Sequence, residues 1–205
     1  MRKVKPPEER RQEIITVAER LFFVNGYAKT KITDIIKEMG MSKGIFYYYF
    51  ESKEEVLDAI IQSVIDRDIA AATAIAADPA LNAHEKVFRI IVSHHETITQ
   101  SHRSFVKQIH DVEDPEIGFK TMRLTVLQLL PILVEVAEQG IREGALHIEY
   151  PHETVEFLLA AHTFQFFFGA PIKTEKNKQA YLRMLENALG AERGSFGYLG
   201  DILDE

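Results

Sequence analysis

The sequence predicts an all-α protein of about nine helices, and three observations lead to this prediction. Apolar residues recur three and four positions apart through most of the 205-residue chain, as one side of an amphipathic helix requires. Ser, Asn and Gly residues stand where such segments would begin or end. No segment alternates apolar and polar residues in the way that a half-buried strand does.

Three short helices are expected in the first 50 residues. The first covers 8–24, and Gly26 behind it suits a left-handed helix end. The second covers 31–39, and the third covers 43–50 with Ser42 as its N-cap. The second and third helices, with the tight turn between them, have the lengths of a helix-turn-helix unit.

Capping signals also begin the later helices. Ser52 and Glu55 form a capping-box pattern at the start of a helix that ends near Ala76, and Asn82 and Glu85 repeat the pattern. Further helices are expected over 83–99, 103–110, 115–142, 152–169 and 175–189. Their capping residues and apolar periodicity predict a larger helical region after the first 53 residues.

Two proline positions and the C-terminus complete the predicted layout. Pro115 suits the first position of a helix, and Pro131 is expected to kink the helix that follows. Residues 191–205 are expected to form a weakly packed tail.

Composition excludes several classes of protein. Hydrophobic residues make up 46% and charged residues 27%, an ordinary globular balance. The chain has no cysteine, so it has no disulfide and no thiolate ligand or nucleophile. No apolar run follows the basic N-terminus as in a signal peptide, and the most apolar stretch, 157–172, is shorter than the ~20 residues of a membrane helix. We expect a cytoplasmic protein.

Charge divides the chain unevenly. The net charge is −7, but residues 1–53 carry 11 Lys and Arg against 7 Asp and Glu, a charge of +4. Residues 54–205 carry 13 against 24, a charge of −11. A small basic domain (1–53) that faces a polyanion, joined to an acidic domain (54–190), would produce this distribution, although chance clustering would too.

The aromatic run over 46–50 is expected to divide between two sides of its helix. On a helical wheel, the apolar side carries Ile45, Phe46, Tyr49 and Phe50. The opposite side carries Lys43, Gly44, Tyr47 and Tyr48. Tyrosine hydroxyls and a lysine ammonium can donate to phosphate oxygens, and glycine removes bulk where a helix enters a groove. A surface helix with half-covered rings would show the same pattern.

These motifs resemble the N-terminal DNA-binding segment of the TetR family of transcriptional regulators. The matching features are Gly26-Tyr27, the Thr-x-Ile-x-Asp-Ile pattern over 30–35, the Gly-x-Ser-Lys-Gly turn over 40–44, the Phe-Tyr-Tyr-x-Phe run over 46–50, and Ser-Lys-Glu-Glu over 52–55. The match is dense over about 50 residues, whereas beyond residue 65 only size and helical layout agree.

The resemblance implies a homodimer whose two helix-turn-helix units reach successive major grooves of an operator, ~34–36 Å apart. Carried over position by position, the DNA contacts would be Lys31, Thr33, Ser42, Lys43, Gly44, Tyr47, Tyr48 and Lys53. The chain departs from the family at Thr33, often Arg, at Ile45, often Thr or Ala, and at Tyr49, often His. The basic residues 1–5 could reach a minor groove, or form a frayed end.

The resemblance also implies a C-terminal domain that binds a ligand and forms the dimer. A largely apolar cavity would be lined by His110, Phe119, Met122, Arg123, Val126 and His162. The interface would contain Phe157, Leu158, Ala161, Phe164, Phe168, Tyr181, Leu185 and Leu189. Ordinary core packing would give similar patterns. The predicted function is a repressor that releases its operator when a small ligand binds, although repression rather than activation follows only from the family.

Two other functions are weighed against this one. Histidines and acids gather over 94–111, including His94, His102, His110 and Asp111, and suggest a metal-dependent hydrolase. No pair of these histidines has the spacing of four residues found on helical metal sites, so we expect no metal, no cofactor and no enzyme. The other alternative is a helical adaptor that has lost DNA binding.

Overall fold

The structure is a computed structural model, which describes residues 6–102, 115–168 and 174–200. Side chains at 95–102, 115–118, 120, 122 and 166–168 lie outside the description. The predicted helix over 103–110, with His110 and Asp111, also lies outside it. The described residues are all-α, as predicted. The helices are α1 (Pro7–Asn25), α2 (Ile32–Glu38), α3 (Lys43–Tyr49), α4 (Lys53–Ala76), α5 (Ala83–His102), α7 (Pro115–Arg142), α8 (Pro151–Phe168) and α9 (Glu175–Ala188), followed by a 3₁₀ turn, η1 (Gly197–Leu199).

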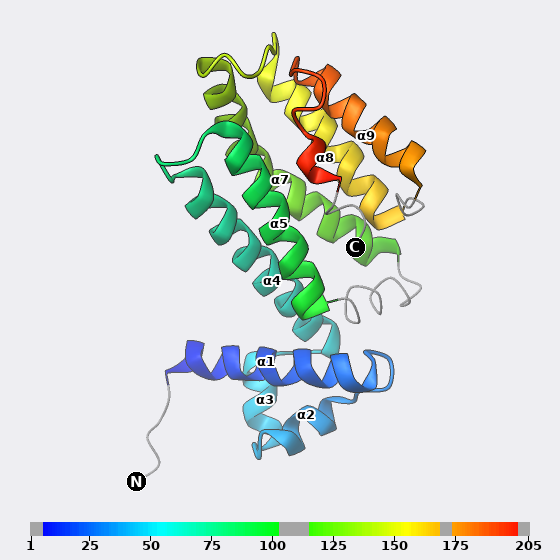
Figure 1. Cartoon of the computed structure of the whole chain (residues 1–205). Helices are drawn as coiled ribbons and strands as arrows, with labels where there is room; N and C mark the ends of the chain where they lie inside the picture. Colours follow the sequence, from blue (N-terminus) through cyan, green and yellow to red (C-terminus); the bar gives the residue numbers. More distant parts are fainter. Residues whose placement is uncertain (1–5, 103–114, 169–173, 201–205) are drawn as a thin grey trace. The chain divides into compact units, whose positions relative to one another are not determined.

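The chain divides into two compact units, shown in Figure 1. The first comprises Met1–Asp66 with Ile98–Ile117, and the second comprises Arg67–Thr97 with Gly118–Glu205. Helices α4, α5 and α7 contribute to both. Each unit has its own core and is described by itself.

The core of the first unit is made by one side of α1, by α2 and α3, and by the start of α4. Its fully buried side chains include Ile14, Phe22, Ile35, Phe46, Phe50 and Val56. Gly26 ends α1 with a φ of 85°, and its N–H donates to the Phe22 carbonyl at 2.9 Å. Thr30 follows in the loop, where its buried hydroxyl bonds to the carbonyl oxygens of Leu21 and Gly26. The helix ends where predicted, although a ψ of 145° places Gly26 outside the left-handed helical conformation.

Side-chain caps fix the starts of three helices, because the first N–H groups of a helix lack partners within it. Ser42 Oγ accepts from the Ile45 N–H at the start of α3, and Ser52 Oγ accepts from the Glu55 N–H at the start of α4. Before α5, Asn82 and Glu85 make both bonds of the predicted capping box, each 2.9 Å long. These local signals explain why the helix starts were predictable.

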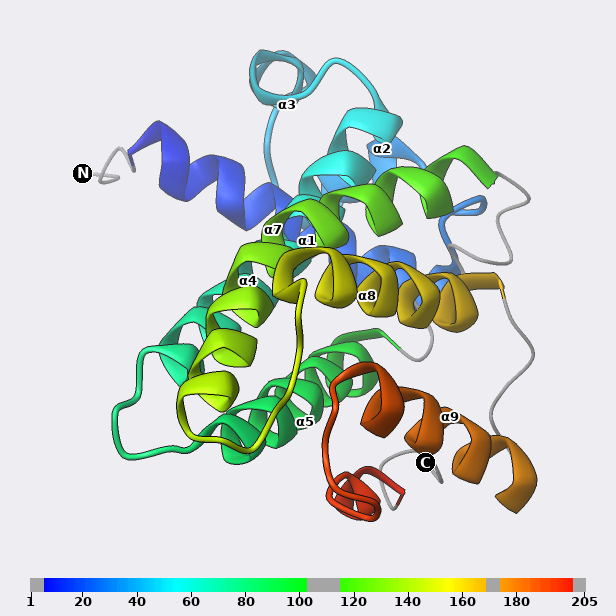
Figure 2. The same ribbon diagram turned by 90° about the horizontal axis from the view of Figure 1, so that it is seen from above.

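The second unit packs the end of α4, α5, α7, α8 and α9 around one apolar core. Its buried members include Ala83, Ile90, Leu129, Val136, Leu146, Val155, Leu159 and Leu182. Helices α7 and α8 lie side by side in both views (Figures 1 and 2). Gly140 allows α7 to approach the following loop, since a Cβ there would lie 2.6 Å from Leu146 Cδ1. Helix α7 continues through Pro131, and the kink expected there stays a prediction.

The expectation of a weakly packed C-terminal tail is wrong for residues 196–199. Phe196 is 1% exposed and Leu199 is 2% exposed, and both belong to the core of the second unit. A short irregular segment has no periodicity to reveal which of its side chains are buried. Burial of the aromatic ring alone stabilises the fold by roughly 1.5–3 kcal/mol, which explains why the segment is held.

One described helical segment, Arg123–Arg142, has the length and apolar composition of a membrane span. A third of it is buried inside the protein, including Leu129, Leu130, Val136 and Ala137 in the core. The packing of the second unit therefore accounts for part of the apolar character of α7.

Candidate nucleic-acid interface

Helix α3 divides its aromatic residues between the core and the surface. Phe46 and Phe50 are 0% and 1% exposed, whereas Tyr47 is 44% and Tyr48 is 75% exposed. The Phe46 ring contacts Phe50 and also meets Tyr47 edge to face, with centroids 5.5 Å apart. The predicted exposure of the two tyrosines is confirmed. The two buried phenylalanine rings anchor α3 in the core of the first unit.

Ile45 differs from the prediction. The helical wheel placed it with the core residues, but its side chain is 45% exposed, while Tyr49 is half-buried. The reason is that the buried side of α3 centres on Phe46 and Phe50. Ile45 lies about 140° from Phe50 around the helix, so it falls outside that side.

Gly44 has no role in the packing of the folded chain. It lies within α3 with no positive φ, and a Cβ added there would meet nothing within 4 Å. Glycine inside a helix costs roughly 0.5–1 kcal/mol relative to alanine. The folded chain therefore gives no reason for glycine here, whereas close approach of another molecule would.

The predicted contact residues around α3 are mostly accessible. Lys31, Thr33, Ser42 and Lys43 are exposed, and the Lys43 ammonium lies 5.8 Å from the centre of the Tyr47 ring. Lys31 precedes α2, where its backbone N–H donates to the Asp34 carboxylate at 2.8 Å. The structure thus presents an ammonium and two tyrosines on one short helix, with further polar groups at the start of α2.

Lys53 has a structural role that the sequence did not predict. It is half-buried, and its ammonium donates to the carbonyl oxygens of Tyr27 (3.0 Å) and Thr30 (3.3 Å). It also lies 4.1 Å from the centre of the Tyr27 ring. These contacts hold the α1–α2 loop against the start of α4. They engage the group that was expected to contact phosphate, and a DNA contact by Lys53 stays a prediction.

The other cations of the first unit differ in their availability. Arg10 is paired with Glu13, and Arg20 with Glu38, while the Arg11 guanidinium lies 4.8 Å from the centre of the Phe50 ring. Lys29 and Lys37 are exposed. Sequence reasoning did not select Lys29, because only its charge and its place beside Lys31 distinguish it.

In the second unit, the structure brings two of the predicted residues together. The Tyr181 hydroxyl forms a 2.7 Å hydrogen bond with His162 Nδ1, which connects α9 to α8. Burial, with the neighbouring charge of His94, lowers the pKa of His162 to about 4, and burial raises the pKa of Tyr181 to about 12. His162 is therefore neutral at pH 7, with one ring nitrogen able to donate and the other able to accept.

The other residues predicted to line a ligand cavity differ in their burial. Phe119 is 51% exposed and Arg123 is exposed, so in the described structure neither is enclosed as a cavity lining would be. Val126 packs against the core. The side chain of Met122 and all of His110 lie outside the described residues. Their role in binding a ligand stays a prediction.

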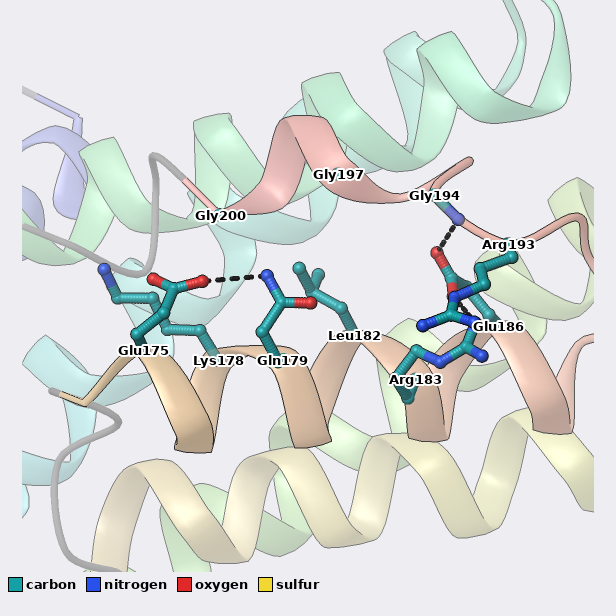
Figure 3. A pocket seen from close by; sticks show the side chains of 10 residues that line it. All are labelled: Glu175, Lys178, Gln179, Leu182, Arg183, Glu186, Arg193, Gly194, Gly197 and Gly200. Carbon is teal, nitrogen blue, oxygen red and sulfur yellow. Dashed lines mark hydrogen bonds and ion pairs between the residues drawn. The ribbon is translucent and has the colours of Figure 1, made fainter.

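A cavity of about 340 Å³ lies instead between α9 and the C-terminal segment (Figure 3). Its lining is mostly polar and includes three glycines, and Leu182 is its apolar member. Glu186 accepts from Arg183 at 2.8 Å and from the Gly194 N–H at 2.6 Å, and these bonds hold the pKa of its carboxyl below the usual value, Arg183 most strongly. Because the Glu186 carboxylate is already bonded to Arg183 and Gly194, its main role is to join the C-terminal segment to α9.

The residues predicted for a dimer interface separate into two groups. Phe157 is 71% exposed, Phe164 is 53% exposed, and Ala161 is exposed between them on α8. Leu158 and Leu185 pack partly against the core, and Tyr181 is half-buried. The assignment of Leu189 to an interface is corrected, since it is 9% exposed and belongs to the core of its own chain. The side chain of Phe168 lies outside the description.

The histidine-rich stretch forms no recognisable metal site in the part that can be described. Among the described residues, no group of three or more His, Cys, Asp or Glu side chains could hold an ion. His94 Nδ1 lies 2.6 Å from Asp68 Oδ2, as a pair. His102 and His110 have no described side chains.

Comparison with known proteins agrees with this geometry. Residues 14–60 match the family model of bacterial regulatory proteins, tetR family. The chain is 22% identical over 198 residues to the HTH-type transcriptional repressor KstR2 of Mycolicibacterium smegmatis, across 92% of this chain and 94% of that protein. It is 43% identical over 53 residues to an uncharacterized HTH-type transcriptional regulator in the lacX 3′ region of Lactococcus lactis, where the match spans only 27% of the relative.

A solved structure supports the same assignment over most of the chain. The transcriptional regulator of the TetR/AcrR family from Thermobifida fusca YX-ER1 superposes with a TM-score of 0.64 at 27% identity, covering 90% of this chain and 99% of that one. The N-terminal motif match and the similarity of the whole helical layout thus point to one family. Together these comparisons support a TetR family transcriptional regulator.

Proposed function

We propose that this DNA-binding regulator is a repressor that binds double-stranded operator DNA as a homodimer and releases it when a small, largely apolar ligand binds the second unit. Regulators of this family are DNA-binding proteins and not enzymes. The observation that carries the proposal is α3, which buries Phe46 and Phe50 while it exposes Lys43, Tyr47 and Tyr48. A regulator that binds operator DNA would act in the cytoplasm.

The exposed side of α3 supports recognition of a duplex. Lys43, Tyr47 and Tyr48 can donate to phosphate oxygens and fix the helix in the groove, while the residues at the start of α3 reach base edges. Gly44 has no side chain, so the α3 backbone can come close to the DNA at this position. Lys31 and Thr33 at the start of α2 and Ser42 at the start of α3 complete the proposed contacts, with Lys53 supporting the loop between α1 and α2.

The exposed side of α8 supports a homodimer. Phe157, Ala161 and Phe164 stand at i, i+4 and i+7, so they share one side of the helix. A second copy that presents the same side would bury both in an isologous interface. Met184 on α9 is a further exposed apolar side chain of the second unit, at 39%.

Two observations support ligand control and repression. His162 and Tyr181 form a hydrogen-bonded polar pair in the second unit, whose core is apolar, and a few polar groups in an apolar setting can orient a ligand. A relative of nearly the same length carries the name transcriptional repressor. A ligand that binds the operator-free form more tightly would lower DNA affinity by mass action.

The proposal is tested by selecting duplexes from a random library with the purified chain. The affinity of the chain for the selected duplexes is then measured by fluorescence anisotropy. Wild-type protein should enrich a near-palindromic site and bind it with strong salt dependence. A dimeric chain that enriches no sequence would instead support the adaptor alternative.

A further inference from the structure

Ile45 occupies an unusual place in α3. Its side chain is 45% exposed in the first half of the helix, beside Gly44 and one turn before Tyr48. Its backbone N–H is held by the Ser42 hydroxyl, so the cap fixes where its Cβ points. Isolated exposed apolar residues are common on proteins, but this one lies within the surface that the proposed function assigns to DNA.

An apolar side chain at the start of a recognition helix has one apolar partner in the major groove. Each base pair presents hydrogen-bond donors and acceptors there, and only thymine adds a methyl group, on C5. Lysine, serine and tyrosine nearby can bond to phosphates or base edges, but Ile45 offers only van der Waals and hydrophobic contact.

We propose that Ile45 determines sequence specificity by packing against the C5-methyl group of a thymine in each half-site of the operator. The inference rests on the proposed function, since it requires that α3 enters the major groove. Gly44 assists this contact because the position beside Ile45 adds no side chain that would hold the helix away from the base. The β-branched side chain is stiff at χ1, so little entropy is lost when it meets the methyl group.

The test removes only the methyl group. The preferred duplex is first selected with wild-type protein, and each thymine is then replaced in turn by deoxyuridine, which keeps all hydrogen-bonding groups. One symmetric pair of replacements should weaken wild-type binding by about fourfold for each half-site, the effect of losing one buried methyl group. Replacements elsewhere should change affinity much less. The dissociation constants are measured by fluorescence anisotropy at one salt concentration.

Variants of Ile45 identify the side chain that senses the methyl group. Ile45→Ala should bind more weakly and lose the difference between thymine and deoxyuridine at that position. Ile45→Val should keep most of the difference, whereas Ile45→Thr, which has nearly the shape of valine, should lose much of it because a hydroxyl replaces a methyl group. Lys43→Ala is the matched control on the same helix, and it should weaken binding to both duplexes equally.

The outcomes separate this inference from the proposed function. If wild-type protein selects a site but no thymine is sensitive to loss of its methyl group, the assignment to Ile45 is wrong while the regulator remains. The same holds if Ile45→Ala retains the full discrimination. If the protein selects no duplex, the proposed function itself fails. Circular dichroism checks that each variant is folded, which is expected because the side chain is exposed.

Discussion

The ammonium of Lys53 lies 4.1 Å from the centre of the Tyr27 ring and donates to the Tyr27 carbonyl at 3.0 Å. A hydrogen bond from a charged donor and a cation–π contact each contribute about 0.5–3 kcal/mol. Lys53→Ala should therefore lower the free energy of unfolding by roughly 1–2 kcal/mol. Urea titrations followed by circular dichroism measure this, with exposed Lys37→Ala as the control. A variant of unchanged stability that binds DNA with a lower salt dependence would show that Lys53 acts mainly on phosphate.

Gly44→Ala should change stability and DNA binding in opposite directions. Alanine favours the helix by about 0.5–1 kcal/mol, and its methyl group meets nothing in the folded chain. The same methyl group would enter the space between α3 and the duplex, so the dissociation constant for the selected site should rise about tenfold, equivalent to roughly 1.4 kcal/mol. Thermal unfolding measures the change in stability, and fluorescence anisotropy on the same preparation measures the dissociation constant. Equal or tighter DNA binding would show that the glycine has no role in close approach.

Lys43→Ala should weaken operator binding and reduce its dependence on salt. An ammonium that contacts phosphate releases a condensed cation, so its loss should lower the slope of log K against log salt by about one unit. Tyr47→Ala should also weaken binding, with little change in slope because the hydroxyl is uncharged. Lys176→Ala on the exposed side of α9 is a control for charge alone. An unchanged slope for Lys43→Ala would exclude a phosphate contact at this position.

Phe157→Asp should convert the proposed dimer to a monomer. A carboxylate on the apolar side of α8 would be buried without a partner in an isologous interface. Because the interface is symmetric, the dimer would bury two such carboxylates. Light scattering after size exclusion should show the mass fall to that of one 23.4 kDa chain, and operator affinity should fall with it. Leu127→Asp on α7 is the matched control, since Leu127 is 58% exposed but was assigned to no interface. A dimer that survives Phe157→Asp would place the interface elsewhere.

Stability should fall as the pH decreases from about 6.5 to about 4, owing to His162. Burial lowers its pKa to about 4 in the folded chain, so the unfolded chain takes up the proton first and is favoured as the pH falls. The shift corresponds to up to about 3 kcal/mol, fully lost only below pH 4. Urea titrations between pH 7.5 and pH 5 should show a flatter profile for His162→Gln, whose amide can still form a hydrogen bond with Tyr181. His152→Gln, whose side chain is 59% exposed, is the control variant.

Where local chemistry decides the outcome, the sequence was sufficient. The starts of α3, α4 and α5 were predicted because Ser42, Ser52 and Asn82 cap N–H groups only three residues away. The end of α1 was predicted because Gly26 tolerates a positive φ. The exposed tyrosines followed from the helical period, and the motifs of the first 60 residues were dense enough to indicate the family.

What the sequence by itself determined was thus the helical class, most helix boundaries and the polar side of α3, since each depends on neighbours along the chain. Only the tertiary structure decided that Ile45 is exposed, that Lys53 holds the α1–α2 loop, and that Phe196 and Leu199 enter the core. Those outcomes depend on which distant segments come to lie beside a side chain and how much volume they fill. The amphipathic period of a single helix carries no such information.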